Sequence, residues 1–203
     1  MESLDSEKKL IENILAGNPD EFRVLINQYK KLVSHILFRL ISNQNDRDEL
    51  SQEIFIKIYE NLKSFKFQSK LSTWIGRIAH NTCLNYLRKK RLHFYDDQIN
   101  YQKDENKERN IRADIHEAKS PSFLPDEVAN QSQVSSFINN EIEVLPIQYR
   151  EVITLYHLDN FSIKEISEIM GVPEGTVKSH LYRSRKLLKD RLTTKYNLEE
   201  LCI

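Results

Sequence analysis

Apolar residues recur at helical spacing along most of the chain. No segment alternates apolar and polar residues with the period of two that a half-buried strand requires, so no sheet is expected. After the polar stretch SNQNDRDEL, one apolar residue returns at every fourth position. The pattern predicts an all-α protein, and its clearest apolar stripe consists of Leu50, Ile54, Ile58 and Leu62.

Glycine and proline punctuate this helical pattern sparingly, with 4 Gly and 5 Pro in the chain. Gly17 ends a first helix, and Asn18 followed by Pro19 provides an N-cap and a first helical residue for the second. Helices are accordingly predicted from Pro19 to about residue 41, over 46–62 and 72–92, and again from about 132, with a break before Pro146.

The apolar stripe is lost between about residues 93 and 131. The stretch from Tyr95 to Val128 contains nine acids, five bases and two prolines, Pro121 and Pro125. This composition predicts a solvated, flexible linker between two small helical domains. A surface helix over about 104–119 is the alternative. The predicted organisation is a first domain over 1–92, an acidic linker over 93–131 and a second domain over 132–203.

The second domain contains two helical patterns around a Gly-Val-Pro break. Ser162 and Glu165 form a capping box that begins the first of these helices. Gly171 permits the left-handed conformation of a helix C-cap, and Pro173 begins the next helix. Two short helices joined by a tight turn are typical of a helix-turn-helix.

The last predicted helix has an apolar side and a basic side. Its apolar arc contains Val177, Leu181, Ser184 and Leu188, and the opposite arc contains Ser179, Tyr182, Arg183 and Lys186. Arg and Lys donate to guanine or phosphate, Ser can contact either, and Tyr offers stacking or methyl contact. This face therefore has the chemistry for reading DNA.

Net charge hides a segregation of positive charge. The chain has 30 Lys plus Arg and 30 Asp plus Glu. No acid occurs between Asn61 and Tyr95, where eight Lys and Arg residues lie, and from Thr176 to Lys195 seven bases stand beside Asp190 alone. Single basic runs are usually solvated helix faces. Two such surfaces, each interleaved with aromatic or hydroxyl residues, favour two contacts with one polyanion.

Several classes of function lack support in the sequence. No apolar stretch is long enough for a membrane span, and the first residues, MESLDSEKKL, do not resemble a signal peptide, so we expect a cytoplasmic protein without membrane insertion. Cys83 and Cys202 have no metal-site or redox spacing. Paired carboxylates, a nucleophile elbow and a glycine-rich phosphate loop are missing. We expect neither an enzyme nor a cofactor.

Four motifs resemble those of a known family in the same order and spacing. They are DRDELSQEIFIKIYENLKSF at 46–65, STWIGRIAHNTCLNYLRKKR at 72–91, LPIQYREVITLYHLDNFSIKEIS at 145–167 and MGVPEGTVKSHLYRSRKLL at 170–188. From about residue 18 to 91 and from 132 to 192, the chain resembles the extracytoplasmic-function (ECF) sigma factors of bacterial RNA polymerase. The resemblance implies sigma domains two and four, promoter DNA as ligand, and both core polymerase and an anti-sigma factor as partners.

The same resemblance assigns residues to three surfaces. The helix over 46–62 would dock on the clamp helices of the largest polymerase subunit through Asp48, Glu49, Gln52, Glu53 and Ile56. The minus-ten element would be melted and held by Phe65, Lys66, Arg77, Asn81, Arg88 and Lys89, with Asn81 reading a flipped base. The minus-thirty-five element would be contacted by Lys178, Ser179, Tyr182, Arg183, Lys186 and Lys189.

A free-standing helix-turn-helix regulator is the alternative interpretation. Such a protein shares the C-terminal motif but usually joins it to a receiver or ligand-binding domain that contains strands. Here the first domain is predicted to be helical and basic, which favours the sigma factor.

Overall fold

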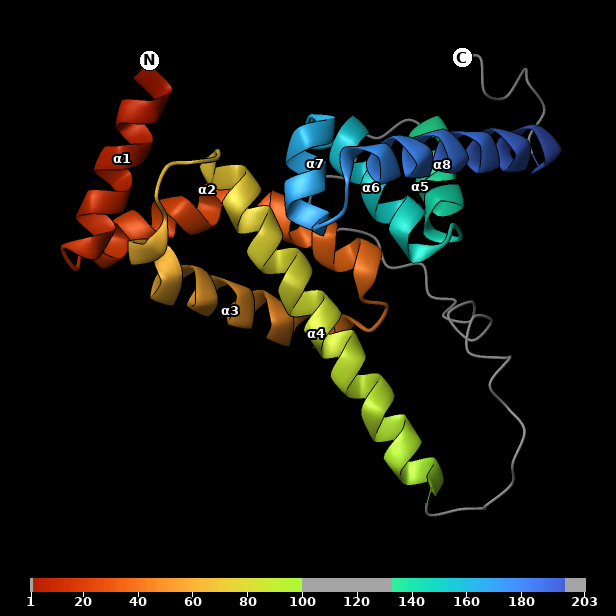
Figure 1. The fold of residues 1–203 in the computed structure, drawn as a ribbon, viewed down its shortest axis with the longest axis horizontal. Helices are drawn as coiled ribbons and strands as arrows, with labels where there is room; N and C mark the ends of the chain where they lie inside the picture. Colours follow the sequence, from red (N-terminus) through yellow and green to blue (C-terminus); the bar gives the residue numbers. More distant parts are fainter. Residues whose placement is uncertain (1, 100–132, 196–203) are drawn as a thin grey trace.

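The computed structural model of the chain describes residues 2–99 and 133–195, and all of its regular elements there are helices. Figure 1 shows their arrangement. The N-terminal half contains α1 (Glu2–Leu15), α2 (Pro19–Leu40), α3 (Gln44–Asn61), the 3-10 turn η1 (Leu62–Ser64) and α4 (Leu71–Ile99). The C-terminal half contains α5 (Gln133–Glu143), α6 (Ile147–His157), α7 (Ile163–Met170) and α8 (Glu174–Lys195).

Local capping explains where several helices begin and end. The Asn18 side chain accepts a hydrogen bond from the Asp20 backbone N–H, and Pro19 opens α2. Ser162 and Glu165 make both bonds of a capping box at α7. That helix ends at Gly171, whose φ of 65° is left-handed. These predicted helix ends are confirmed.

The fourth helix is longer than the sequence pattern predicts. Helix α4 continues to Ile99 instead of ending near residue 92. No Gly or Pro interrupts residues 93–99, so nothing there stops the backbone hydrogen bonds after the apolar stripe is lost. The rest of the predicted linker, including the alternative helix over 104–119, lies outside the described residues.

The N-terminal half packs its helices around α2 and α4. The predicted stripe of α3 is buried, with Ile54 and Ile58 fully inaccessible. From α4, Leu71, Ile75 and Ala79 are also inaccessible to solvent. One side of α4 therefore belongs to the core, which leaves its opposite side available for a ligand.

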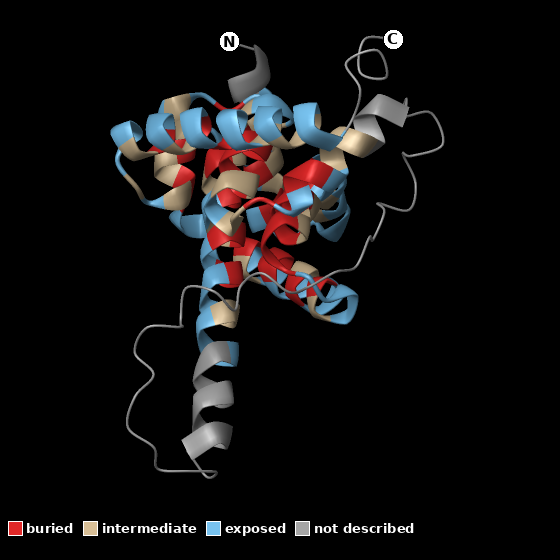
Figure 2. Ribbon diagram, turned by 90° about the vertical axis from the view of Figure 1, so that its right-hand side faces the viewer, coloured by how far each residue is buried: buried red, intermediate tan, exposed pale blue. Residues whose placement is uncertain are grey.

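The two halves pack directly against each other and share one hydrophobic core. Figure 1 shows α7 beside α4, and Figure 2 shows the buried residues gathered in the interior of the folded part. Gly76 of α4 faces Ile169 of α7 so closely that a Cβ at position 76 would lie 3.1 Å from the Ile169 Cδ1 atom. A glycine at this position lets the two helices approach. We call this packing of the two halves the closed arrangement.

Polar side chains also cross between the halves. Arg39 of α2 is buried and donates from Nε to Thr154 Oγ1 at 2.8 Å, while its terminal nitrogens reach Glu143 and Asn139. Lying on α4, His80 places its Nδ1 2.5 Å from the Glu151 carboxylate. Both of these side chains are almost fully buried. These interactions fix one relative orientation of the halves.

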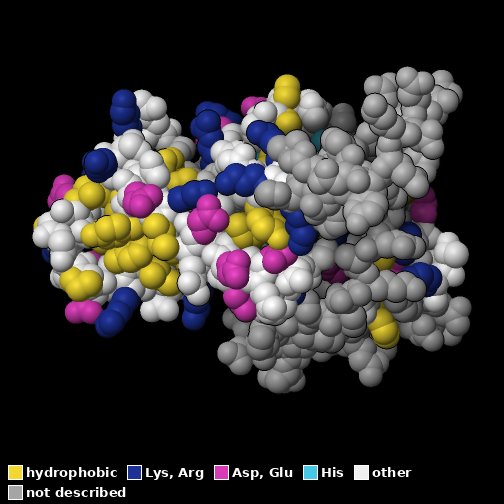
Figure 3. All heavy atoms as spheres, turned by 90° about the horizontal axis from the view of Figure 1, so that it is seen from below, with side chains coloured by type: hydrophobic (Ala, Val, Ile, Leu, Met, Phe, Trp, Pro, Cys, Tyr) yellow, Lys and Arg dark blue, Asp and Glu magenta, His cyan; other side chains and the backbone are white. Residues whose placement is uncertain are grey.

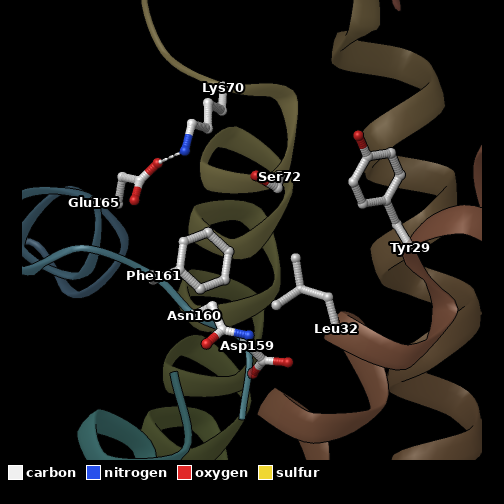
Figure 4. A pocket seen from close by; sticks show the side chains of 8 residues that line it. All are labelled: Tyr29, Leu32, Lys70, Ser72, Asp159, Asn160, Phe161 and Glu165. Atoms are coloured by element: carbon white, nitrogen blue, oxygen red, sulfur yellow. Dashed lines mark ion pairs between the residues drawn. The ribbon is translucent and has the colours of Figure 1, made fainter. Parts of the chain in front are cut away.

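A pocket with a volume of about 220 Å³ lies at one edge of the same junction. Figure 4 shows that its lining comes from both halves, with Tyr29 and Leu32 on one side and Phe161 on the other. The Lys70 ammonium lies 2.9 Å from the Glu165 carboxylate across the junction. The Asp159 carboxylate lies 2.7 Å from His35 Nδ1, also across the junction. The pocket therefore exists only while the halves are together.

Candidate nucleic-acid interface

Helix α8 presents its predicted reading face to solvent. Tyr182 is 70% exposed, more than any other large hydrophobic residue in the described part of the chain. Val177, Leu181 and Ser184 are buried on the opposite side and hold the helix on the domain. The other predicted minus-thirty-five residues, all exposed, are Lys178, Ser179, Arg183, Lys186 and Lys189.

Neighbouring groups fix the orientation of α8. His180 packs edge-on against Tyr149, with ring centroids 5.4 Å apart. Burial and the nearby Arg183 charge lower the pKa of His180, so its ring stays neutral at neutral pH. The neutral ring packs as part of the support, and the positive charge of this face comes from lysine and arginine.

Some bases of α8 support the fold rather than the exposed face. Arg191 Nε donates to Glu141 at 2.7 Å, and Lys195 Nζ donates to the same carboxylate at 2.8 Å. Burial alone raises the pKa of Glu141, but the hydrogen bonds from these two bases hold it below its ordinary value. The basic run of α8 therefore has an exposed N-terminal part and a C-terminal part whose bases form ion pairs with Glu141 of α5.

The outer side of α4 forms a second exposed basic strip. Arg77, Asn81 and Arg88 lie four and seven residues apart, so they follow one side of the helix. All three are exposed, as is Lys89. Asn81 thus presents its amide to solvent, although the adjacent His80 is buried against Glu151.

The loop before α4 contains an aromatic cluster. The Phe65 ring is only 8% exposed and lies 5.4 Å from Trp74, measured between centroids, so Phe65 belongs to the core. Its centroid is also 4.8 Å from that of Phe67, which is 38% exposed. The burial of Phe65 gives no support to the prediction that it contacts DNA, whereas Lys66 beside it is exposed.

Within the run Arg88-Lys89-Lys90-Arg91, Lys90 has a partner in the protein. Its ammonium lies 2.9 Å from Asp46, which also accepts from the Tyr86 hydroxyl. The hydrogen bonds from Tyr86 and Lys90 lower the pKa of Asp46, so its carboxylate stays charged at neutral pH. This link joins the start of α3 to the exposed strip of α4.

Helix α3 presents an acidic and apolar face away from its buried stripe. Ile56 is 57% exposed and Tyr59 is 51% exposed, and the two lie three residues apart on one side of the helix. Figure 3 shows hydrophobic side chains gathered at the end of the molecule formed by α1, α2 and α3, with charged groups around them. The remaining predicted docking residues, all exposed, are Asp48, Glu49, Gln52 and Glu53.

Other kinds of site find little support in the described residues. Within them, no group of His, Cys, Asp and Glu side chains could hold a metal ion. Burial raises the pKa of Cys83 to about 12, which keeps its thiol protonated and unreactive. A search of the same residues for a helix long and apolar enough to cross a membrane found none.

Sequence reasoning missed the residues that join the two halves. Arg39 and His35 lie outside the four motifs, and Glu151 lies inside one that gives it no role. The partners of all three residues are more than seventy residues away in the sequence. The glycine at position 76 was the one available signal, because a glycine inside a helix is unfavourable unless something packs closely against it.

Comparison with known proteins shows that two protein-family models match the chain. The model described as Sigma-70 region 2 matches residues 25–93, and the one described as Sigma-70, region 4 matches residues 138–188. The ECF RNA polymerase sigma factor SigW of Bacillus subtilis is 33% identical over 186 residues, covering 91% of this chain and 96% of SigW. The ECF RNA polymerase sigma-E factor of Escherichia coli is 30% identical over 187 residues, covering 92% of this chain and 94% of that protein.

Solved structures show the same fold. The sigma factor RpoE of Bartonella quintana, in complex with the anti-sigma factor NepR, aligns with a TM-score of 0.66 at 21% identity, covering 88% of this chain and 100% of that one. CnrH, in complex with the cytosolic domain of CnrY, aligns with a TM-score of 0.59 at 17% identity, covering 92% of this chain and 97% of that one.

Proposed function

The chain belongs to the extracytoplasmic-function sigma factors of RNA polymerase, and we propose that it works through three separate surfaces on α3, α4 and α8. Sigma factors are initiation factors and not enzymes: they bind core polymerase and direct it to promoters. The observation that carries the assignment of surfaces is that two exposed basic strips and one exposed acidic strip lie on three different helices. The alternative of a free-standing regulator has no observation in its favour.

Helix α3 is the proposed docking surface for the clamp helices of the largest polymerase subunit. Asp48, Glu49, Gln52 and Glu53 supply charge and hydrogen-bonding groups, and Ile56 supplies an apolar contact. Charge of one sign steers association, while apolar burial slows dissociation. Glu53 is paired with Lys57 at 2.6 Å, so docking would exchange an internal ion pair for one with the partner.

Reversing two of these charges should weaken docking at least tenfold. The variant carrying Glu49→Lys and Glu53→Lys is expected to lose co-elution with core polymerase in gel filtration while keeping its far-ultraviolet helix signal. A control with Glu12→Lys and Glu174→Lys makes the same change in net charge at exposed acids elsewhere. Equal loss of binding in the control would mean that net charge, not the α3 surface, governs docking, and unchanged co-elution of the first variant would contradict the assignment.

The outer side of α4 and the preceding loop are the proposed site for the melted minus-ten element. Lys66, Arg77, Arg88 and Lys89 form a positive track for the backbone, as proteins that bind single strands require. The exposed Asn81 amide offers both a donor and an acceptor to a flipped base. Phe65, being buried, would support this loop from within.

Helix α8 is the proposed reader of the minus-thirty-five element. Lys178, Ser179, Tyr182 and Arg183 lie near its N-terminal end, which a helix-turn-helix inserts into the major groove. Lys186 and Lys189 lie further along the helix and are better placed for phosphates. Base contacts and phosphate contacts should then respond differently to mutation.

Arg183→Ala should weaken binding to the proper promoter by about 1–3 kcal/mol and relax the preference at one or two base pairs. Lys189→Ala should instead weaken binding to all sequences about equally and reduce the slope of log affinity against log salt by about one. Binding of the polymerase complex to single-base promoter variants at two salt concentrations measures both. A uniform loss for Arg183→Ala, without any change in preference, would remove α8 as the reading helix.

The closed arrangement must open for this function. The two elements are centred about 25 base pairs apart, which corresponds to about 85 Å of duplex. The distance between Asn81 and Tyr182 in the closed arrangement is bounded by the backbone length from Asn81 to Gly76 and from Ile169 to Tyr182, joined by the contact between Gly76 and Ile169. This length is at most about 45 Å. One closed chain therefore cannot hold both elements at once. The predicted linker over 93–131 would permit the separation of a domain over 1–92 from one over 132–203.

Membership of this family also suggests an anti-sigma factor as a partner and the cytoplasm as the compartment. The relatives of known structure were solved with an anti-sigma factor or with the cytosolic domain of CnrY. An anti-sigma factor that recognises the closed arrangement would keep the chain from its promoter. Transcription takes place in the cytoplasm, and we place the protein there.

A further inference from the structure

Phe67 stands out in the minus-ten loop because its backbone is left-handed. Its φ is 56°, in a region that bulky L residues rarely occupy. Glycine is the usual residue for such a conformation, since it has no Cβ. A phenylalanine here costs backbone strain, and the 38% exposed ring recovers only part of that by burial. The loop therefore keeps an exposed ring at an unfavourable backbone position.

Neighbouring rings hold Phe67 in place from one side. Phe65 lies 4.8 Å away between centroids, at an interplanar angle of 57°, and packs in turn on Trp74. Because Phe65 and Trp74 belong to or pack against the hydrophobic core, the Phe67 ring is supported from the domain interior. Rigid support lowers the entropy cost of binding a flat ligand.

Helix α1 adds a cation to this ring. The Lys8 ammonium lies 5.7 Å from the Phe67 ring centroid, within the range of a cation–π interaction. Lys8 is exposed. The matched Sigma-70 region 2 begins at residue 25, so α1 lies outside it. The ammonium thus lies over one face of the exposed ring, and Lys66 beside Phe67 in the sequence is also exposed.

We propose that Phe67 and Lys8 form a nucleotide clamp for an unpaired base of the melted non-template strand, distinct from the base that Asn81 would read. The ring stacks on the base, and the ammonium leaves the ring face to contact the adjoining phosphate. Stacking on an aromatic ring needs no particular base, because every base has a π-face. The clamp rests on the proposed function of α4 in minus-ten recognition, and it adds α1 to the DNA-binding surface.

Location along α4 separates the clamp from Asn81. Trp74, which carries the ring cluster, and Asn81 are seven residues apart, so they lie on one side of α4 about two turns or 10 Å apart. Two bases of one extended single strand, with one or two nucleotides between them, can span that distance. A strand that follows the basic strip would then meet the ring cluster at one end and Asn81 further along.

The test uses the full chain in complex with core polymerase and a single-stranded minus-ten oligonucleotide. Phe67→Gly suits the left-handed backbone and removes the whole side chain, including the ring, so it should weaken oligonucleotide binding about tenfold. Phe67→Tyr should bind within about twofold of the parent. Lys8→Ala should reduce the slope of log affinity against log salt by about 0.7, the value for one phosphate on a single strand. Val144→Gly, which removes another exposed apolar side chain, should have no effect.

Fluorescent 2-aminopurine placed at successive positions of the oligonucleotide locates the stacked base. The parent should quench one position that Phe67→Gly leaves bright, and Asn81→Ala should affect a different position. Normal binding by Phe67→Gly together with weak binding by Asn81→Ala would overturn the clamp and leave the proposed function standing. Normal binding by both variants would overturn the minus-ten site itself. Loss of core polymerase binding in Phe67→Gly, or failure of Phe67→Tyr to bind, would show a structural role instead.

Discussion

Joining the two halves by a disulfide should abolish promoter-directed transcription. The double variant Gly76→Cys with Ile169→Cys places two thiols where a Cβ at position 76 already lies 3.3 Å from Ile169 Cγ1. The sulfur of a cysteine at position 169 would take the place of Ile169 Cγ1, so the two thiols would lie close enough to form a disulfide. Oxidised protein would be held closed and could not reach both promoter elements. Run-off transcription with core polymerase should be lost under oxidising conditions and restored by dithiothreitol.

The existing cysteines allow a clean control. Cys83 is buried with a raised pKa, and Cys202 can be replaced by serine in all variants. Each single cysteine variant should transcribe equally well with and without reductant. The oxidised double variant should still co-elute with core polymerase, because the acidic face of α3 is exposed in the closed arrangement. Full transcription by the oxidised variant would show that the closed arrangement can engage a promoter.

Arg39→Ala should have the opposite effect to the disulfide and favour separation of the two halves. Removing one partner of a buried pair costs about 3–5 kcal/mol, and the lower end applies because Glu143 is 44% exposed and remains partly solvated. The loss concerns the contact between halves, since the partners of the guanidinium, Thr154, Glu143 and Asn139, all lie in the C-terminal half. Small-angle scattering should show a larger radius of gyration at unchanged helix content.

A substitution on the same helix provides the comparison for Arg39. Arg23 is also on α2, but its side chain is 78% exposed and its ion pair is with Asp20 of the same helix. Arg23→Ala should leave both the radius and the thermal midpoint nearly unchanged. Arg39→Ala should retain transcription with core polymerase, because opening is required there. An unchanged radius in Arg39→Ala would mean that apolar packing alone keeps the halves together.

Sequence pattern was sufficient for the helices and for the faces of α8. The capping box at Ser162, the left-handed Gly171 and the buried Val177 and Leu181 all depend on contacts close in the sequence. The end of α4 was predicted too early, because an apolar stripe shows where a helix is covered and not where its hydrogen bonds stop. Local signals thus predict element type better than element length.

The relative position of the halves could not be predicted from pattern. Arg39 and Thr154 are 115 residues apart in sequence, and buried ionisable residues such as Glu151 look like surface residues in a helical pattern. The role of Phe67 was equally unpredictable, since the family resemblance assigned the DNA contact to Phe65 and a backbone angle cannot be read from a residue name. Both features depend on the folded chain, the first on contacts between distant residues and the second on a backbone angle.

The shared core also sets how strongly polymerase that carries this sigma factor engages a promoter. If only the open chain engages both promoter elements, the apparent affinity of its polymerase complex for a promoter is reduced to the fraction that is open. A preference of about 3 kcal/mol for the closed arrangement corresponds to roughly a hundredfold reduction. Because the closed chain keeps its α3 surface for core polymerase, closure would lower promoter engagement and not polymerase binding, and small changes at the Gly76 contact would alter transcription from all promoters of this sigma factor together.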